Sequence, residues 1–257
     1  QGIWGSAFVG LENFKAFFAT NNWITVTGNT LFLNVLFIAA TTITSVAIAI
    51  MLAEISNKWV KKITQSIVIL PHFMSWTIVS MLSVAILSAN GVVNQLITMI
   101  GGKTIEFYNT PSVWPAILVI LKVWQGAGFG SIVYLATITG IDASIYEAAA
   151  VDGASKTQCI FKVTLPMLKN TIIMLTIMSV GKIFNGDFGM IYAMVGSNSI
   201  LYPTTDVIDT YLFRQLLENP SMGQTAAVGL IQSILGFGFV VLCNKVANKW
   251  SPESALF

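Results

Sequence analysis

Long uncharged apolar stretches constrain the fold of this chain more than any other feature. Four of them, residues 29–53, 63–102, 123–141 and 219–244, contain no Asp, Glu, Lys or Arg. Each is near or above the ~20 residues that a helix needs to cross the hydrocarbon layer of a membrane. Only 9% of all residues are charged, whereas a soluble domain has about 25%. Strands of this length and hydropathy do not fit a barrel, so the sequence predicts an all-α, polytopic membrane helix bundle.

Five membrane spans are predicted from the hydropathy pattern, at residues 29–53, 63–89, 112–141, 170–195 and 222–247. The fourth is interrupted by the polar stretch GKIFNGDFG at 181–189. Two interpretations fit this stretch. It is either a bend in the helix beside a transport pathway or the outer end of the span.

The distribution of Lys and Arg predicts the orientation, because cytoplasmic loops retain these residues. Eight lie on one side of the five-span arrangement and three on the other. The eight are Lys58, Lys61, Lys62, Lys156, Lys162, Lys169, Lys245 and Lys249, and the three are Lys15, Lys103 and Arg214. We therefore expect 142–169 and the C-terminus to be cytoplasmic, and 1–28, 90–111 and 196–221 to face outward.

Several function classes are disfavoured by composition. A net charge of +2 without basic and aromatic residues interleaved does not indicate a nucleic-acid partner. Two cysteines and one histidine are too few for a Cys/His metal cluster or a disulfide framework. No P-loop pattern is present, so we expect the chain to bind neither ATP in that manner nor any other cofactor. The first residues lack the charged and apolar regions of a signal peptide, so we expect the N-terminus to be truncated or only partly ordered.

A compact polar module, EAAAVDGASKTQCIFKVTLP at 147–166, separates the third and fourth spans. Two pairs have capping-box spacing, Ser144 with Glu147 and Ser155 with Gln158. Gly153 can end the first of the two short helices in a left-handed conformation, and Pro166 fits where the second gives way to the next span. A docking module for a partner and an ordinary interfacial hairpin fit this pattern about equally well.

The module resembles the EAA loop of binding-protein-dependent ABC importer permeases. The matching residues are Glu147, Ala148, Ala149, Gly153, Leu165 and Pro166, while Val163 stands where that family often has Ile. The resemblance implies a coupling helix that docks into a cleft on an ATPase subunit. It assigns this contact to Tyr146, Glu147, Ala148, Ala149, Asp152, Gly153, Leu165 and Pro166.

Further segments extend the resemblance over nearly the whole chain. They are VGLENF (9–14), LPHFMSW (70–76), NGVVNQLI (90–97), GSIVYLATITGIDASIYEAAAVDGA (130–154), TTDVIDTYLFRQL (204–216) and SPESALF (251–257). They are similar to the sugar permeases related to the maltose importer, closest to the branch for complex oligosaccharides and polysaccharide fragments. Residues 29–257 would then be the transmembrane domain, and the first helix of the usual six would be missing.

The resemblance also implies partners and a location. These are a second homologous permease, two cytoplasmic ATPase subunits that bind ATP and Mg, an extracellular sugar-binding protein, and the lipid of a prokaryotic cell membrane. Residues 197–221 mix aromatic side chains with Asp206, Asp209, Arg214 and Glu218. We expect this segment to be the docking surface for the binding protein.

Ionisable residues inside the membrane mark functional sites by default. Lys122 and Gln125 share a helix face beside Trp124, which favours a sugar-facing patch over snorkelling of Lys122 to the outer headgroups. Lys182 and Asp187 are five residues apart, so we expect them to pair with other helices or to lie at a break. With Asn185, the predicted pathway set is Lys122, Trp124, Gln125, Lys182, Asn185 and Asp187.

Other polar residues of the spans are predicted to serve packing. Thr30, Asn34, Thr41 and Ser45 form a stripe on the first span that favours helix association over substrate contact. Gly229 and Ser233 predict close packing of the last span, and His72 is expected to be an interfacial or bundle-facing polar group.

Two other functions fit the sequence less well. A secondary transporter for a small polar solute would need internal repeats and ion-binding groups near the midplane, and the halves show no clear repeat. An intramembrane enzyme would need a paired nucleophile and base or a metal set, which a lone His72 does not supply.

Overall fold

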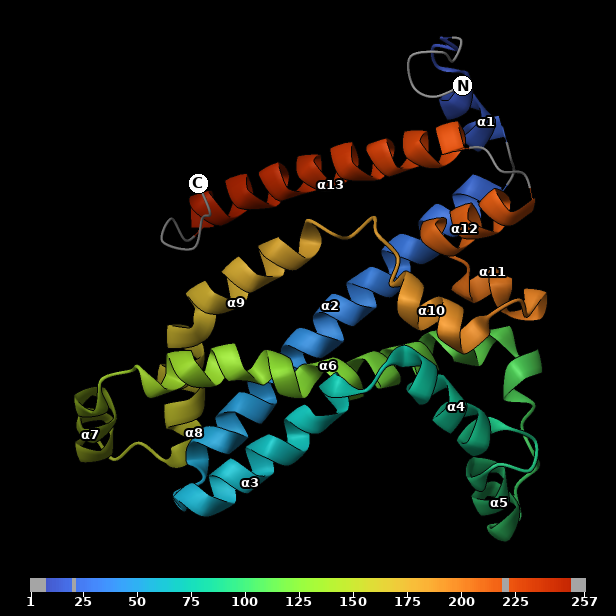
Figure 1. Cartoon of the computed structure of the whole chain (residues 1–257). Helices are drawn as coiled ribbons and strands as arrows, with labels where there is room; N and C mark the ends of the chain where they lie inside the picture. Colours follow the sequence, from blue (N-terminus) through green and yellow to red (C-terminus); the bar gives the residue numbers. More distant parts are fainter. Residues whose placement is uncertain (1–7, 20–21, 219–221, 251–257) are drawn as a thin grey trace.

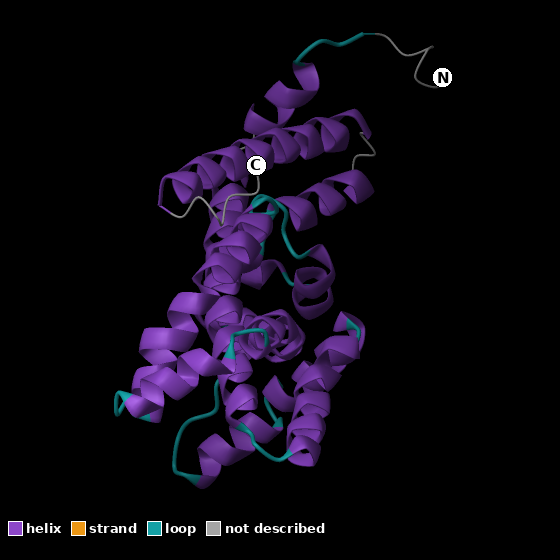
Figure 2. Cartoon of the chain, turned by 90° about the vertical axis from the view of Figure 1, so that its left-hand side faces the viewer, coloured by secondary structure: helices purple, strands orange, loops and turns teal. Residues whose placement is uncertain are grey.

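The chain is a bundle of helices in a computed structural model that describes residues 8–19, 22–218 and 222–250 (Figures 1 and 2). Within these ranges it contains no strand, which confirms the all-α prediction. The α-helices are α1 (Glu12–Ala19), α2 (Asn22–Glu54), α3 (Lys58–Ile69), α4 (Trp76–Leu87), α5 (Val92–Met99), α6 (Trp114–Thr139), α7 (Ala143–Val151), α8 (Lys156–Cys159), α9 (Leu165–Val180), α10 (Phe188–Val195), α11 (Tyr202–Thr205), α12 (Ile208–Glu218) and α13 (Met222–Trp250).

Short turns of other helix types join some of these elements. Four are 3₁₀ turns, η1 (Leu70–Phe73), η2 (Phe107–Asn109), η3 (Pro111–Val113) and η5 (Ser199–Leu201), and one is a π-helical turn, η4 (Ile160–Thr164).

The pair α2 and α6 forms the centre of the bundle. The two helices approach closely where Ser45 of α2 donates a hydrogen bond to the carbonyl oxygen of Ala127 at 3.0 Å. Gly130 makes this possible, because an added Cβ there would lie 2.7 Å from the Ser45 oxygen. Small residues at the contact let two membrane helices pack by van der Waals contact, since lipid supplies no hydrophobic drive between them.

Apolar side chains fill the space on either side of this contact. One buried cluster includes Leu33, Trp114 and Met190, and the other includes Ala49, Tyr134 and Leu168. Many large apolar side chains on the outside of the bundle are exposed, as expected where helices face lipid.

Among the residues that the structure describes, five helices are long and apolar enough to cross a membrane, which confirms the predicted number of spans. They cover Asn22–Glu54, Trp76–Met99, Pro111–Thr139, Lys156–Val180 and Met222–Lys249. The predicted bounds of the fourth span, 170–195, are wrong. Its helix begins at Lys156 and ends at Val180, because the polar stretch after Val180 unwinds the chain.

The predicted bounds of the second span, 63–89, are also wrong, because the chain breaks near the middle of this range and the candidate span is Trp76–Met99. Pro71 lies in η1, and Ser75 starts α4 by accepting a hydrogen bond from the backbone N–H of Ile78 at 3.4 Å. His72 stacks on Phe129 of α6, with ring centroids 4.1 Å apart and planes 7° from parallel. The prediction that His72 is a bundle-facing group is therefore confirmed.

The two ends of the bundle differ in which segments they carry. Figure 1 shows α7, α8, the beginning of α3 and the end of α13 at one end, and α1, α5 and α11 at the other. The segments with most of the predicted cytoplasmic lysines thus lie together. The membrane orientation itself stays a prediction, and residues 1–7, 20–21 and 251–257 of the predicted terminal segments lie outside the described residues.

Candidate functional site

The chain unwinds between α9 and α10, at residues 181–187. Side-chain amides from other helices satisfy its carbonyl groups. Asn34 of α2 donates to the carbonyl oxygens of Ile183 and Asn185, both at 3.0 Å, and Gln232 of α13 donates to that of Phe184 at 2.8 Å. Irregular backbone at membrane depth is tolerated where it is buried in protein or lines a cavity. The break is therefore an anchored part of the fold.

Glycines let neighbouring segments approach this break. An added Cβ at Gly186 would lie 2.4 Å from a methyl carbon of Val207, and the Gly186 N–H donates to the Asp209 carboxylate. An added Cβ at Gly236 would lie 2.7 Å from the carbonyl oxygen of Gly181. The last span thus packs closely through Gly236. The predicted contact at Gly229 is wrong within this chain, because no atom lies within 4 Å of a Cβ added there.

An ion pair connects the break to α6. The Lys122 ammonium lies 2.5 Å from a carboxylate oxygen of Asp187, and both side chains are partly buried. The other oxygen of Asp187 accepts from the backbone N–H of Met190 at 3.2 Å and so caps α10. The expectation that Lys182 and Asp187 do not pair with each other is confirmed, since Asp187 pairs across to another helix and Lys182 lies in the break.

A recess of about 400 Å³ opens beside the ion pair. Four of the six predicted pathway residues line it, namely Lys122, Lys182, Asn185 and Asp187. The rest of its lining comes from α2, α9, the break and the start of α10, and consists of Asn34, Phe37, Ile38, Thr41, Ser179, Gly186 and Phe188. The recess is therefore bordered by α2, α6 and α9 with the unwound segment at its edge.

The structure does not bring the other two predicted pathway residues to this recess. Gln125 donates from its amide to the carbonyl oxygen of Met74 at 3.4 Å, at the corner before α4. Trp124 is 43% exposed and is not part of the lining. Lys122 and Gln125 share one face of α6 but contact different segments, Lys122 the break and Gln125 the corner before α4.

A second recess, of about 390 Å³, continues the first toward the other end of α2. Thr41, Ser179 and Lys182 line both. Sequence reasoning missed Ser179, and it assigned Thr41 to helix packing. That assignment is confirmed for the other three residues of the stripe, which bond to backbone groups of other helices or loops. Thr41 differs, because its buried hydroxyl has no hydrogen-bond partner among the described residues.

The polar loop 142–169 begins with a helix cap that differs from the prediction. Asp142, not Ser144, caps α7, because its carboxylate accepts from the backbone N–H of Ser144 at 2.9 Å. This hydrogen bond lowers the pKa of Asp142. The predicted capping box of Ser144 with Glu147 is therefore wrong, since the helix starts earlier and Ser144 lies inside it.

The corner between α7 and α8 matches the prediction. Gly153 has φ +75°, a left-handed conformation that favours glycine. The backbone N–H groups of Gly153 and Ala154 donate to Ala150 and Ala149 at 3.0 and 2.9 Å, which is the Schellman pattern of a helix end. The capping box of Ser155 with Gln158 is present in both directions.

The second short helix does not end at Pro166, contrary to the prediction. It continues through the π-helical turn η4 into α9, so that Lys156–Val180 is one helical rod of 25 residues. Pro166 fits because it lies in the first turn of α9, where its missing N–H costs little. The Tyr146 hydroxyl lies 3.0 Å from that of Thr164 in η4, which ties α7 to the rod.

The predicted coupling residues fall into two groups. Glu147, Ala148, Asp152, Gly153 and Pro166 are exposed, whereas Tyr146, Ala149 and Leu165 are half-buried. The exposed group is free to contact another protein. The half-buried group packs within the loop and holds its shape.

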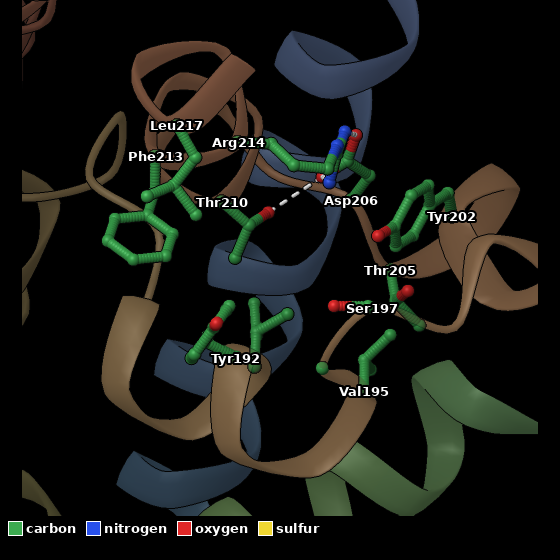
Figure 3. A pocket seen from close by; sticks show the side chains of 12 residues that line it. Tyr192, Val195, Ser197, Tyr202, Thr205, Asp206, Thr210, Phe213, Arg214 and Leu217 are labelled. Atoms are coloured by element: carbon green, nitrogen blue, oxygen red, sulfur yellow. Dashed lines mark hydrogen bonds and ion pairs between the residues drawn. The ribbon is translucent and has the colours of Figure 1, made fainter. Parts of the chain in front are cut away.

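The charged residues of the predicted outer docking surface mostly bond to this chain. Arg214 pairs with Asp206 through two hydrogen bonds of 2.6 and 3.1 Å and lies 4.0 Å over the ring of Tyr202 (Figure 3). Asp209 accepts from Gly186 and from Gln232. Charge reversal at Arg214 or Asp209 would therefore break internal contacts of this chain. Residues 219–221 of this surface lie outside the described residues.

Comparison with protein families places most of the chain in one match. Residues 45–249 match the family described as binding-protein-dependent transport system inner membrane component. The polygalacturonan/rhamnogalacturonan transport system permease protein YteP of Bacillus subtilis (strain 168) is 32% identical over 253 residues, covering 98% of this chain and 78% of that protein. Protein LplB of the same strain is 31% identical, covering 98% of this chain and 79% of that protein.

A solved structure has the same fold. A chain of a bacterial alginate ABC transporter, in complex with an alginate pentasaccharide-bound periplasmic protein, matches with a TM-score of 0.88 and 33% identity. The match covers 95% of this chain and 84% of that chain.

Proposed function

This chain belongs to the binding-protein-dependent transport system inner membrane components, the permease subunits of ABC importers, and we propose that it forms half of a pathway for an oligosaccharide or polysaccharide fragment. The other half would be a second, homologous permease. Two cytoplasmic ATPase subunits would bind ATP and Mg, and an extracellular sugar-binding protein would deliver the substrate.

The observation that carries this proposal is the open groove along α2. Residues from Asn34 to Thr41 line the first recess, Thr41 to Ser45 the second, and Ile50 to Glu54 a third of about 290 Å³ beside α7. A single chain leaves these recesses open on one side. A second permease packed over them would close them into a passage that runs from the break to the loop 142–169.

The substrate class is supported by the relatives and by the groove. YteP is called a permease for polygalacturonan/rhamnogalacturonan, and the solved structure is that of a transporter of alginate. A further relative is the arabinooligosaccharides transport system permease protein AraP of Halalkalibacterium halodurans, 31% identical over 58% of this chain and 47% of that protein. Hydroxyl, amide and aromatic side chains line the first recess. Such side chains suit a sugar, because they offer hydrogen bonds and flat apolar surface.

The loop 142–169 has the features of a mechanical coupling element. Its exposed residues Glu147, Ala148 and Gly153 would contact an ATPase subunit. The rod Lys156–Val180 runs from this loop to the break at 181–187. Since a helix is stiff along its axis, a push on the loop would be delivered at the break, where the groove is lined by Asp187 and Lys182.

Purification of the tagged chain from its native membrane tests this proposal. We expect a second permease and an ATPase subunit to co-purify, and sugar with its binding protein to increase ATP hydrolysis. The alternative, a secondary transporter for a small polar solute, predicts that the chain purifies alone and transports in response to an ion gradient. That result would contradict the proposal.

A further inference from the structure

The first and second recesses share one lysine with which no described residue forms an ion pair, and we infer that this lysine, Lys182, binds a carboxylate of the transported sugar. This inference rests on the proposed function and deepens it, because it names the substrate as an acidic oligosaccharide that carries uronic acid units. Lys182 would then determine specificity within the pathway.

Lys182 is placed where a passing substrate would meet it. It lies in the unwound segment, its side chain is exposed, and it lines both the first and the second recess. Among the described residues none forms an ion pair with it. Lysines of membrane proteins that have no ion-pair partner are found in water-filled cavities and mark substrate or ion pathways, and the position of Lys182 in the two open recesses fits such a role.

The other cation in the lining of these recesses already has a partner, because Lys122 pairs with Asp187 at 2.5 Å. Two lysines and one aspartate are the only charged residues in the lining of the first recess, which therefore carries one net positive charge. In the second recess Lys182 is the only charged residue of the lining. Lys182 is therefore the one cation that lines both recesses and has no ion-pair partner among the described residues.

A single free ammonium in this setting favours a carboxylate over other anions. A carboxylate carries one negative charge and accepts charge-assisted hydrogen bonds, which are about twice as strong as neutral ones. A sugar phosphate carries up to two charges and would leave one unbalanced here. The neighbouring Thr41 hydroxyl, buried and without a partner among the described residues, and the exposed Asn185 amide add neutral hydrogen bonds for sugar hydroxyls.

The ring of Phe188 gives the recess an aromatic wall next to Asp187. It stacks on Tyr192, with ring centroids 5.2 Å apart, so its orientation is fixed. The recess thus combines a fixed aromatic face, one unpaired cation and several groups that can bind hydroxyls. This combination suits a uronic acid unit better than a neutral sugar, because a neutral sugar has no negative charge to pair with the cation.

Transport by the complete importer in proteoliposomes, with its binding protein, tests this inference. The probes are trisaccharides of galacturonate and of mannuronate, together with the carboxyl-reduced counterpart of each. The variants are Lys182→Met, which removes the charge, Lys182→Arg, which keeps it, and Lys169→Met as a matched control. Lys169 lies on the rod that ends just before the break, is exposed, and lines none of the recesses described.

The native importer should transport at least one uronate trisaccharide faster than its reduced counterpart. Lys182→Met should lower this preference by about tenfold, the effect of one lost charge-assisted hydrogen bond, whereas Lys182→Arg and Lys169→Met should keep it. All variants are measured with the same binding protein, so its own selectivity contributes equally to each ratio of uronate transport to reduced-sugar transport. A difference in this ratio between variants therefore comes from the permease.

Three results would overturn the inference. In the first, Lys182→Met keeps the native preference. In the second, Lys182→Met releases the second permease and lowers transport of both sugars equally, which would mean that Lys182 pairs with a residue of that subunit. In the third, the native importer transports neutral oligosaccharides alone, which would leave the proposed function intact. Failure of every sugar to stimulate ATP hydrolysis would instead contradict both proposals.

Discussion

Replacing Gly153 by valine should uncouple ATP hydrolysis from transport without preventing membrane insertion. Gly153 has φ +75°, and no atom lies within 4 Å of a Cβ added to it. The substitution therefore causes no clash, and its cost comes from the backbone alone. A left-handed conformation costs an L-residue ~1–2 kcal/mol, and a β-branched residue reaches the upper part of the ~1–3 kcal/mol range for strained positions.

This cost acts on the corner between α7 and α8. A penalty of ~1–3 kcal/mol lowers the population of the native corner by about 5- to 150-fold relative to other arrangements of the loop. The Schellman hydrogen bonds from Gly153 and Ala154 would be lost in those arrangements. The exposed residues of α7 would then no longer be held in a fixed relation to the rod that begins at Lys156.

Two control variants separate backbone strain from side-chain bulk. Gly140→Val adds the same side chain where the loop leaves α6, at φ −87°, with the nearest atom 3.5 Å from the added Cβ. Gly153→Asn keeps a residue that tolerates the left-handed conformation. We expect Gly140→Val to behave like the native chain and Gly153→Asn to fall between the native chain and Gly153→Val.

The assay is ATP hydrolysis by the purified complex in proteoliposomes, measured with and without the sugar-loaded binding protein. Gly153→Val should be present in the membrane at normal levels, while ATPase subunits dissociate from it or hydrolyse ATP without responding to sugar. If Gly153→Val assembles and couples as well as Gly140→Val, the fixed corner has no part in coupling and the reasoning is refuted.

Three further predictions follow from the structure. Gly128→Ala should prevent accumulation of folded protein in the membrane, because the added Cβ would lie 2.0 Å from a backbone oxygen of α3. Gly229→Ala should be neutral, because no atom lies within 4 Å of a Cβ added there. Equal amounts of the two variants in the membrane, measured on a blot, would contradict this prediction. In a variant without the native cysteines, a cysteine at Ser199 should react with an impermeant reagent added to intact cells and one at Ser155 should not; labelling at Ser155 would overturn the orientation. Leu217 is 66% exposed and lines the same pocket as the Arg214–Asp206 ion pair. Leu217→Asp should weaken stimulation of ATP hydrolysis by the loaded binding protein while leaving basal hydrolysis unchanged, and unchanged stimulation would place the docking surface elsewhere.

Much of the fold could be predicted because it depends on local sequence. Uncharged runs about 20 residues long determine how many helices can cross a membrane, and the five spans were predicted on that basis. The break after Val180 was likewise visible in GKIFNGDFG, since glycine and polar residues interrupt the apolar run. The left-handed Gly153 followed from its position between two helix-forming segments.

The parts that could not be predicted depend on contacts between distant residues or on local competition. The partner of Asp187 is Lys122, 65 residues away, and spacing along one helix carries no information about such a pair. Two acceptors, Asp142 and Ser144, could each cap α7, and the chain uses the one that comes first after α6. The rod through Pro166 was missed because a proline usually ends a helix, whereas here it lies in the first turn of α9, after a π-helical turn.

Sugar uptake and ATP hydrolysis measured in the same proteoliposomes test the proposed function most directly, with the native chain compared with Glu147→Lys. Glu147 is exposed on α7, so the change should disturb a partner contact rather than folding. The native complex should take up oligosaccharide only with ATP and the loaded binding protein, and Glu147→Lys should lose both uptake and the response of hydrolysis to sugar. Uptake driven by an ion gradient without ATP, at the same rate in both, would contradict the assignment of this chain as the coupled permease of an ABC importer.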